Sequence, residues 1–315
     1  MKFLVFGLGA LGTVFATCLK ARGVETYGFV KKEKLNVYKN NVFKITGIFG
    51  DREAVLDGIL SEPLEARKVK PDVVLLTVKS FDTEKAVKQI KEFLPQNGLV
   101  ILAQNGYGNY ETAIKYLDKS QVLLARVIFG ARVVSPCFAE VTVIADDVVI
   151  GQPEGAVPEE IQKQIANALN EAGIPTRVSK DVYKILWDKI LYNSALNPLG
   201  AILECNYGTL AENEETREIM NEVVREIFKV TKALKIELNW KSAEEYLKHF
   251  YEKLVPPTAK HFPSMYHDIA LGKKTEIDAL NGAIVKLAKK AGLTTPVNEV
   301  ITNLVKVKEK LKLRN

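Results

Sequence analysis

The segment Lys2-Phe3-Leu4-Val5-Phe6-Gly7-Leu8-Gly9-Ala10-Leu11-Gly12 decides the fold. Its apolar run predicts a buried strand, Lys2–Phe6, and the residues that follow predict a helix, Ala10–Ala21. The glycines between them have the G-x-G-x-x-G spacing of a dinucleotide-binding turn. Gly7 permits the tight turn, Gly9 lets the backbone approach a pyrophosphate, and Gly12 lets the helix pack closely on the strand. We expect the cofactor to contact Gly7, Leu8, Gly9, Ala10, Leu11 and Gly12; a glycine turn without a nucleotide is the alternative.

Short apolar runs alternate with amphipathic stretches through the first half of the chain. The predicted strands are Lys2–Phe6, Thr26–Val30, Val73–Val78, Leu99–Ala103, Leu123–Phe129, Val141–Ile150 and Thr176–Val178, and further helices are predicted at Asp82–Phe93 and Glu159–Ala172. Strands that alternate with helices predict a parallel sheet with helices on both faces. The fold class is therefore α/β, with an N-terminal Rossmann-type doubly wound parallel sheet.

Strand signals fade after about residue 180, and helical patterns separated by turn clusters continue to the end. We expect two domains, a dinucleotide-binding domain over residues 1–180 and an all-helical, substrate-binding domain over residues 181–315. The 315 residues are enough for two cores, and 47% hydrophobic with 26% charged residues is ordinary for a globular protein.

Composition argues against several classes of protein. The net charge of +6 is spread along the chain, which disfavours a nucleic-acid binder. Three scattered cysteines, Cys18, Cys137 and Cys205, predict neither a disulfide framework nor a zinc site, and they favour the reducing cytoplasm. The apolar run Phe3–Leu19 superficially resembles a secretory signal, but it is too short to span a bilayer and carries the glycine pattern. We expect no metal, no nucleic acid and no membrane partner.

The end of the second predicted strand bears on the choice of cofactor. In NAD-specific sites an Asp or Glu ends this strand and binds the ribose 2′-hydroxyl. Here the strand runs into Lys31 and Lys32, two cations that can pair with a 2′-phosphate. We therefore expect NADP(H), although the nearby Glu33 leaves NAD(H) open.

A polar stripe marks the first helix of the second domain. Lys189, Asn193 and Asn197 stand at i, i+4 and i+8 among apolar neighbours, within an arc of roughly 80°. Buried polar groups require partners, so the stripe indicates a binding face; a surface stripe is the alternative. Because Pro198 disfavours helical geometry at the preceding residue, we expect the helix to end or kink at Asn197.

A second polar group of residues lies nearer the C-terminus. Ser264 is expected to begin a helix and Gly272 to end it. Thr275 and Asp278 resemble a capping box, which would place Glu276 in a first helical turn.

These segments together resemble the ketopantoate reductase family. The resemblance is carried by the glycine turn, Val78-Lys79, Gln104-Asn105-Gly106, the Lys189-Asn193-Asn197-Pro198 pattern, Ser264-Met265-x2-Asp268 and Thr275-Glu276-Ile277-Asp278, and it spans essentially the whole chain. It implies a Rossmann domain, a helical domain and an active site in the cleft between them.

The resemblance also implies residue roles. Lys189 matches the family's proton donor, and Asn193, Asn197 and Ser264 match residues that hold the hydroxyl and carboxylate groups of a small 2-keto acid. Asn105 matches a residue beside both nicotinamide and substrate. Lys79, Ala131 and Glu276 match cofactor contacts. A lysine that is only structural, its ammonium reaching solvent, is the alternative for Lys189.

The chain departs from the family in two places. Asn206-Tyr207-Gly208 stands where Asn-Gly is common, so the substrate-binding asparagine is displaced to Asn206, and Gly200 stands where Thr is frequent. The implied activity is NADPH-dependent reduction of ketopantoate, in pantothenate and coenzyme A biosynthesis. Alternatives are a reductase of another branched 2-keto acid, a 3-hydroxyacid or glycerol-phosphate type dehydrogenase, and a non-catalytic NADP sensor. A homodimer is compatible with the sequence, which does not determine the oligomeric state.

Overall fold

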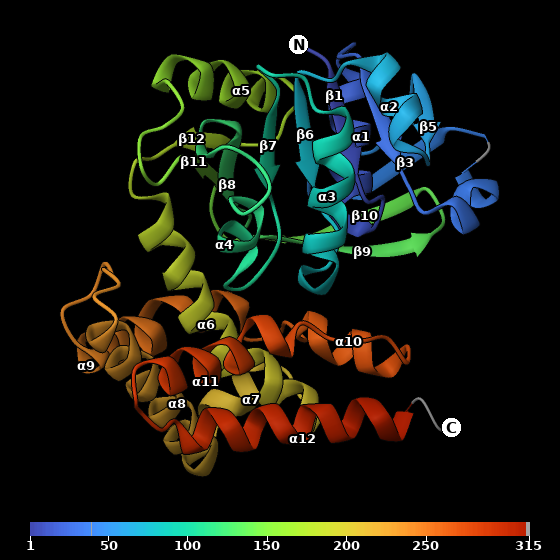
Figure 1. Ribbon diagram of the computed structural model, residues 1–315. Coiled ribbons are helices and arrows are strands. Elements are labelled where there is room, and N and C mark those ends of the chain that lie inside the picture. Colours follow the sequence, from blue (N-terminus) through green and yellow to red (C-terminus); the bar gives the residue numbers. More distant parts are fainter. Residues whose placement is uncertain (39, 313–315) are drawn as a thin grey trace. The chain divides into compact units, whose positions relative to one another are not determined.

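The chain folds as two compact units in a computed structural model that describes residues 1–38 and 40–312 (Figure 1). The first unit comprises Met1–Gln104 and Asn109–Tyr183, and the second comprises Asn105–Gly108 and Lys184–Asn315. The short segment Asn105–Gly108 therefore belongs to the second unit although the first surrounds it in sequence. None of the helices in the described ranges combines the length and apolar character needed to cross a bilayer.

The first unit is built on an eight-stranded sheet. Its strands, in spatial order, are β12 (Thr176–Val178), β11 (Val148–Gly151), β8 (Val122–Arg126), β7 (Leu99–Leu102), β6 (Val73–Leu76), β1 (Phe3–Phe6), β2 (Thr26–Phe29) and β5 (Gly58–Leu60). The six strands from β8 to β5 run parallel, and β11 pairs antiparallel with β8. This is the strand order of a doubly wound dinucleotide-binding sheet, as the sequence predicts.

Helices of the first unit connect these strands. They are α1 (Ala10–Ala21), α2 (Pro63–Val69), α3 (Thr83–Phe93), α4 (Asn109–Ala113) and α5 (Glu159–Glu171), with 3-10 turns η1 (Lys32–Tyr38), η2 (Ser80–Asp82) and η3 (Lys119–Gln121). The predicted bounds of α1 and β12 agree with the structure, and those of α3 and α5 differ by one residue.

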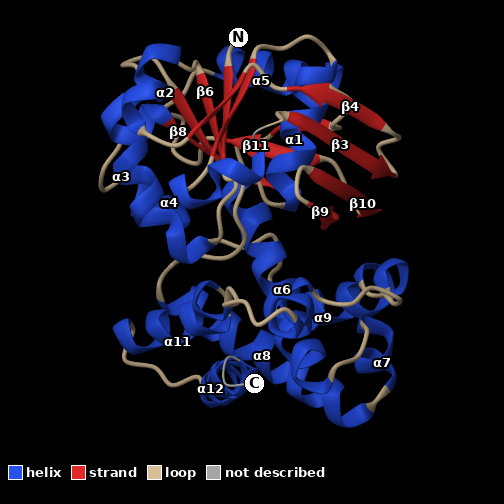
Figure 2. Ribbon diagram, turned by 90° about the vertical axis from the view of Figure 1, so that its right-hand side faces the viewer, coloured by secondary structure: helices blue, strands red, loops and turns tan. Residues whose placement is uncertain are grey.

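A second, four-stranded sheet was not predicted. It consists of β4 (Arg52–Val55), β3 (Val42–Gly47), β10 (Phe138–Ile144) and β9 (Phe129–Ser135) (Figure 2). The predicted strands Leu123–Phe129 and Val141–Ile150 were wrong in extent. Each covers the end of a strand in one sheet and the start of a strand in the other sheet. Breaks at Val127-Ile128 and Ala145–Asp147 separate them, and no glycine or proline marks either break.

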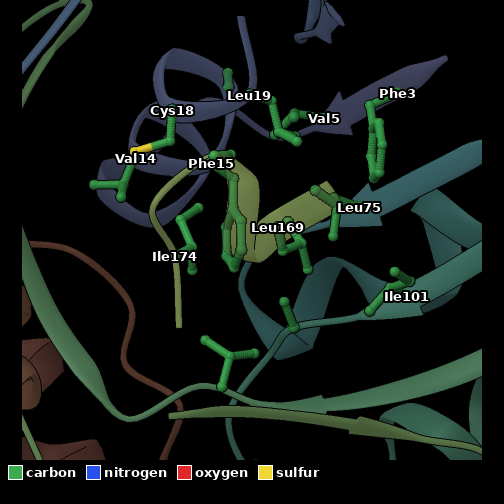
Figure 3. Packing of buried hydrophobic residues seen from close by; sticks show 14 of the residues in the cluster. Phe3, Val5, Val14, Phe15, Cys18, Leu19, Leu75, Ile101, Leu169 and Ile174 are labelled. Carbon is green, nitrogen blue, oxygen red and sulfur yellow. The ribbon is translucent and has the colours of Figure 1, made fainter. Parts of the chain in front are cut away.

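Helix α1 lies between the two sheets, and this explains its composition. It contacts β1 and β2 on one side and all four strands of the smaller sheet on the other. Every residue from Gly12 to Leu19 is buried, and Phe15, Cys18 and Leu19 join strand residues in one core (Figure 3). A helix that is apolar all round is expected only where it is covered on all sides. The run that superficially resembles a secretory signal is therefore a core strand, β1, followed by a core helix, α1.

The second unit is helical throughout its described residues. Its helices are α6 (Val182–Leu203), which begins in the last residues of the first unit, α7 (Tyr207–Glu212), α8 (Glu214–Ala233), α9 (Ala243–His249), α10 (Ser264–Ala270), α11 (Asn281–Lys290) and α12 (Pro296–Lys312). Shorter helical segments are η4 (Phe250–Leu254), η5 (Pro256–Thr258) and η6 (Ile277–Ala279).

Helix α6 runs through Pro198, so the expected helix end at Asn197 was wrong, and the kink given as the alternative stays a prediction. Proline has no N–H, which leaves the carbonyl of Ser194, four residues earlier, without its helical donor. The side chain of Asn281 supplies one, donating from Nδ2 to the Ser194 oxygen at 3.1 Å. This bond removes the cost of a buried orphan carbonyl and lets the helix continue.

Asn281 is itself held by a buried chain of polar groups. Its Nδ2 also lies 3.0 Å from Asn298 Oδ1, and Asn298 Nδ2 donates to Glu226 Oε2 at 2.7 Å. The Glu226 carboxylate accepts from the backbone N–H groups of Val297 and Asn298 as well, and so caps the N-terminus of α12. Helices α6, α8, α11 and α12 are thus joined by one network.

The expected helix end at Gly272 is present, but the expected capping box is not. Gly272 adopts φ +62°, and the N–H groups of Gly272 and Lys273 bond the carbonyls of Ile269 and Asp268, which is a Schellman motif. Thr275 Oγ1 instead donates to Glu309, and Asp278 pairs with Lys306 at 2.7 Å. Glu276 precedes the 3-10 turn η6 rather than lying in a helical turn.

We predict that Asn281→Ala lowers the free energy of unfolding of the second unit by about 2–4 kcal/mol, because two buried acceptors lose their donor. Asn303→Ala, on the exposed side of α12, is the control and should change it by less than about 0.5 kcal/mol. Both tryptophans, Trp187 and Trp240, lie in the second unit, so fluorescence during urea unfolding reports on it. Equal effects of the two substitutions would contradict the role of Asn281.

Candidate active site

The glycine turn has the geometry of an anion-binding helix terminus. Gly7 adopts φ +103°, and a Cβ on Gly12 would stand 2.0 Å from the Gly7 oxygen, so both positions require glycine. A Cβ on Gly9 would meet no heavy atom within 4 Å. Protein packing therefore does not require glycine at position 9; its bare backbone leaves open space at the start of α1.

Within the described residues, the N-terminus of α1 has no side-chain cap: Gly9 has no side chain to provide one, and the first turn contains no acidic residue. Its N–H groups and the positive end of the helix dipole suit a phosphate group. This turn therefore fits the pyrophosphate of a dinucleotide.

The two lysines after β2 are exposed and paired with carboxylates. Lys31 Nζ lies 3.2 Å from Asp82, and Lys32 Nζ lies 3.1 Å from Glu62. Lys31 and Lys32 side chains are 52% and 79% exposed, so these pairs are weak and can give way to a phosphate. Lys79, half-buried, immediately precedes η2, and Ala131 lies in β9 opposite Val141.

The polar face of α6 contains the most specific contact of the second unit. Lys189 Nζ donates to Asn105 Oδ1 at 2.6 Å. An ammonium group can only donate, so this bond fixes the Asn105 amide with its oxygen toward the lysine and its Nδ2 away. Two residues predicted separately from the sequence thus meet in one hydrogen bond.

Asn105 is positioned by a loop that packs on the helical unit. Gly106 adopts φ +85°, and a Cβ there would stand 2.4 Å from the Ala279 oxygen, so only glycine permits this approach. The N–H of Tyr107 donates to the same oxygen at 2.8 Å, and its ring lies 5.4 Å from that of Trp187. These contacts hold the loop against η6 and α6, and so hold Asn105 beside Lys189.

Asn193 and Asn197 continue the same helix face and are 7% and 6% exposed. The side-chain amide of Asn193 has no hydrogen-bond partner among the described residues and is not completely buried. Asn197 Oδ1 accepts a bond from the hydroxyl of Tyr207 at 2.5 Å. Polar atoms that are nearly buried and unused by the protein are expected where a ligand binds.

Ser264 and Asn206 occupy the ends of neighbouring helices. Gly200, one turn beyond Asn197, allows Pro263 to approach α6, since a Cβ there would stand 2.6 Å from Pro263 Cγ. This contact places Ser264, exposed at the start of α10, next to the far end of the polar face. Asn206 caps α7 by accepting from Thr209 N at 2.9 Å. Its predicted substrate contact stays a prediction.

Glu276 lies in the second unit, just before η6, and is 8% exposed. It follows Thr275, whose N–H and hydroxyl both donate to Glu309. No group of three or more His, Cys, Asp or Glu side chains in residues 1–38 and 40–312 could hold a metal ion.

Sequence reasoning missed three residues that build this site. The Tyr207 hydroxyl bonds Asn197, Asn281 bonds the Ser194 carbonyl of α6, and Gly106 admits the Asn105 loop. The sequence did point to Tyr207, because it stands between Asn206 and Gly208 where the resemblance implies Asn-Gly. The sequence did not point to Asn281, because its partner is a backbone carbonyl 87 residues away.

Two family models match the chain, each describing part of the ketopantoate reductase PanE/ApbA. One matches residues 3–155, and the other, for its C-terminal part, matches residues 181–309. A 2-dehydropantoate 2-reductase of Aquifex aeolicus (strain VF5) is 50% identical over 100% of this chain and 99% of its own length. That of Pyrococcus abyssi is 30% identical over 99% of both.

Solved structures agree with these matches. D-mandelate dehydrogenase with NADH and anilino(oxo)acetate has a TM-score of 0.89 at 26% identity, and a PanE/ApbA family ketopantoate reductase from Ralstonia eutropha has 0.86 at 27%. Each alignment covers 99% of both chains. With the glycine turn and the Lys189 site in place and both family models matched, the chain belongs to the ketopantoate reductase family.

Proposed function

We propose that the chain reduces 2-dehydropantoate to pantoate with NADPH, a step in pantothenate and coenzyme A biosynthesis. The observation that carries the proposal is the hydrogen bond from Lys189 to Asn105, set on the same helix face as Asn193 and Asn197. The relative that shares half of its residues across the full length bears the name of this activity.

The cofactor would be held mainly by residues of the first unit, with Glu276 of the second unit as a further contact. The turn from Gly7 to Gly12 would take the pyrophosphate, and Lys31 and Lys32 the 2′-phosphate; Lys79, Ala131 and Glu276 are further proposed contacts. When bound, the reduced nicotinamide supplies the hydride.

Lys189 acts as the proton donor in this proposal. Reduction of the C2 carbonyl builds negative charge on its oxygen, and an ammonium group nearby both stabilises that charge and delivers a proton. Asn105 holds the ammonium through its Oδ1 and so orients the proton donor. The proton donor, Lys189, and the residue that orients it, Asn105, are therefore joined by one hydrogen bond.

Asn193, Asn197 and Ser264 would bind the rest of the substrate. Along an α-helix, four residues advance about 6 Å and eight about 12 Å. Of Lys189, Asn193 and Asn197 on this helix, Asn197 is thus the most distant from the reacting carbon. Of the polar groups of 2-dehydropantoate, the C4 hydroxyl is the farthest from the C2 oxygen, and we assign it to Asn197.

A reductase of another 2-oxo acid is the second candidate. The D-mandelate dehydrogenase structure that resembles this chain was solved with NADH and an oxo acid derivative. Oxidation of NADPH and NADH should be followed with 2-dehydropantoate and with 3,3-dimethyl-2-oxobutanoate, which has methyl in place of hydroxymethyl. We expect 2-dehydropantoate with NADPH to give the highest kcat/KM. A cytoplasmic location and a homodimer stay predictions of the sequence.

We predict that Lys189→Ala lowers kcat by about 10²- to 10⁴-fold and removes the high-pH limb of the rate profile, because the general acid is lost. NADPH affinity and melting temperature should change little. Lys184 lies on the same helix as Lys189 and forms an ion pair with Glu237. Lys184→Ala is therefore the control and should keep kcat within a few-fold. A Lys189→Ala enzyme with near-normal kcat would rule out the proton-donor role.

We predict that replacing both Lys31 and Lys32 by Ala weakens NADPH binding about ten- to a hundred-fold more than NADH binding, because only NADPH carries the 2′-phosphate. Binding is measured by titration of the protein's fluorescence. Lys163→Ala breaks a surface ion pair with Glu159 elsewhere in the first unit and serves as the control. Equal losses for both cofactors would show that the lysines do not bind the phosphate.

We predict that Asn193→Ala and Asn197→Ala each lower kcat/KM for 2-dehydropantoate by about one to two orders of magnitude. For 3,3-dimethyl-2-oxobutanoate the loss in Asn197→Ala should be within about threefold, since that substrate has no C4 hydroxyl to lose. Since the two substrates differ in the C4 hydroxyl, 3,3-dimethyl-2-oxobutanoate serves as the control for the loss of the contact with that group. If Asn197→Ala impairs both equally, the assignment of the hydroxyl is wrong.

A further inference from the structure

Tyr207 is a buried residue that the proposed mechanism does not yet use. It is 4% exposed, and its hydroxyl lies 2.5 Å from Asn197 Oδ1. Complete burial of the phenol raises its pKa well above the ordinary value, so the hydroxyl keeps its proton. Asn197 therefore receives a permanent hydrogen-bond donor on one side of its amide.

The position of that hydroxyl is fixed by the surrounding chain. The N–H groups of Tyr207 and Gly208 donate to the carbonyls of His261 and Ala259 at 3.1 and 2.8 Å. Its ring meets those of Tyr192 and His261 edge-on, at 5.8 and 5.4 Å between centroids. A hydroxyl held in place in this way fixes the orientation of the side-chain amide that accepts its hydrogen bond.

The consequence for Asn197 concerns which atom it can offer. An amide carries one acceptor and one two-proton donor at opposite corners. With Oδ1 engaged by Tyr207, Asn197 has Nδ2 to offer, and no described residue takes a bond from it. This amide thus presents a donor to a ligand.

We propose that Tyr207 is a positioning residue that makes Asn197 a hydrogen-bond donor to the C4 hydroxyl oxygen of the substrate. The proposal rests on the proposed function, which supplies the substrate and its direction along α6. A substrate with methyl at this position leaves the Nδ2 protons of Asn197 unpaired in a nearly dry site. Tyr207 therefore contributes to discrimination without touching the substrate.

The test compares Tyr207→Phe with Tyr192→Phe. Each change deletes one hydroxyl from the same aromatic cluster, but the Tyr192 hydroxyl bonds Thr258 Oγ1, at 2.6 Å, and not Asn197. We expect Tyr207→Phe to lower kcat/KM for 2-dehydropantoate about tenfold and that for 3,3-dimethyl-2-oxobutanoate less than about twofold. Tyr192→Phe should leave the ratio of the two unchanged. Equal ratios in both variants would overturn the proposal.

A double-mutant cycle separates orientation from general damage. In the Asn197→Ala background, Tyr207→Phe should have almost no further effect on kcat/KM, whereas a merely structural role predicts that the two losses multiply. Should the wild-type protein reduce neither substrate, the proposed function fails. The same cycle measured on unfolding free energies then decides: no coupling between positions 197 and 207 overturns the orientation of Asn197 by Tyr207.

Discussion

Burying a polar group without a hydrogen-bond partner costs free energy, and this constraint shapes how the second unit packs around α6. Pro198 leaves the Ser194 carbonyl without a helical donor, and Asn281 of α11 provides one. Lys189 is paired with Asn105 and Asn197 with Tyr207. These partners come from a loop and from two other helices. These bonds fix where those elements pack against α6.

The parts of the fold that follow local chemistry could be predicted from the sequence. The turn from Gly7 to Gly12 has a spacing with few structural uses, and the strands beside it are short apolar runs. The four-stranded sheet could not be predicted, because β3 pairs with β10 across more than 90 intervening residues. Burial does alternate along β3 and β10, but over only a few residues in each, and the polar side chains between the buried ones suggest surface loops. Only the uniformly apolar character of α1 hinted that a second layer covers it.

The candidate site divides in the same way. Lys189, Asn193 and Asn197 are spaced by helical turns, so one helix brings them together and the sequence suffices. Asn105 reaches Lys189 only because the chain leaves β7 and packs Gly106 on the carbonyl of Ala279, more than 170 residues away. Pro198 misled the prediction for the opposite reason: a tertiary bond from Asn281 overrides the local preference of proline to end the helix.

Fold alone does not determine which 2-oxo acid such a chain reduces. A D-mandelate dehydrogenase has a TM-score of 0.89 against this chain at 26% identity, so one backbone serves substrates of different shape. Discrimination must then come from side chains that line the remote end of the substrate, since the reacting carbonyl is common to all. Under the proposed function that end meets Asn197, whose amide oxygen accepts a hydrogen bond from Tyr207. On that proposal, a substitution at Tyr207, which does not contact the substrate, alters specificity while Lys189 and Asn105 are unchanged.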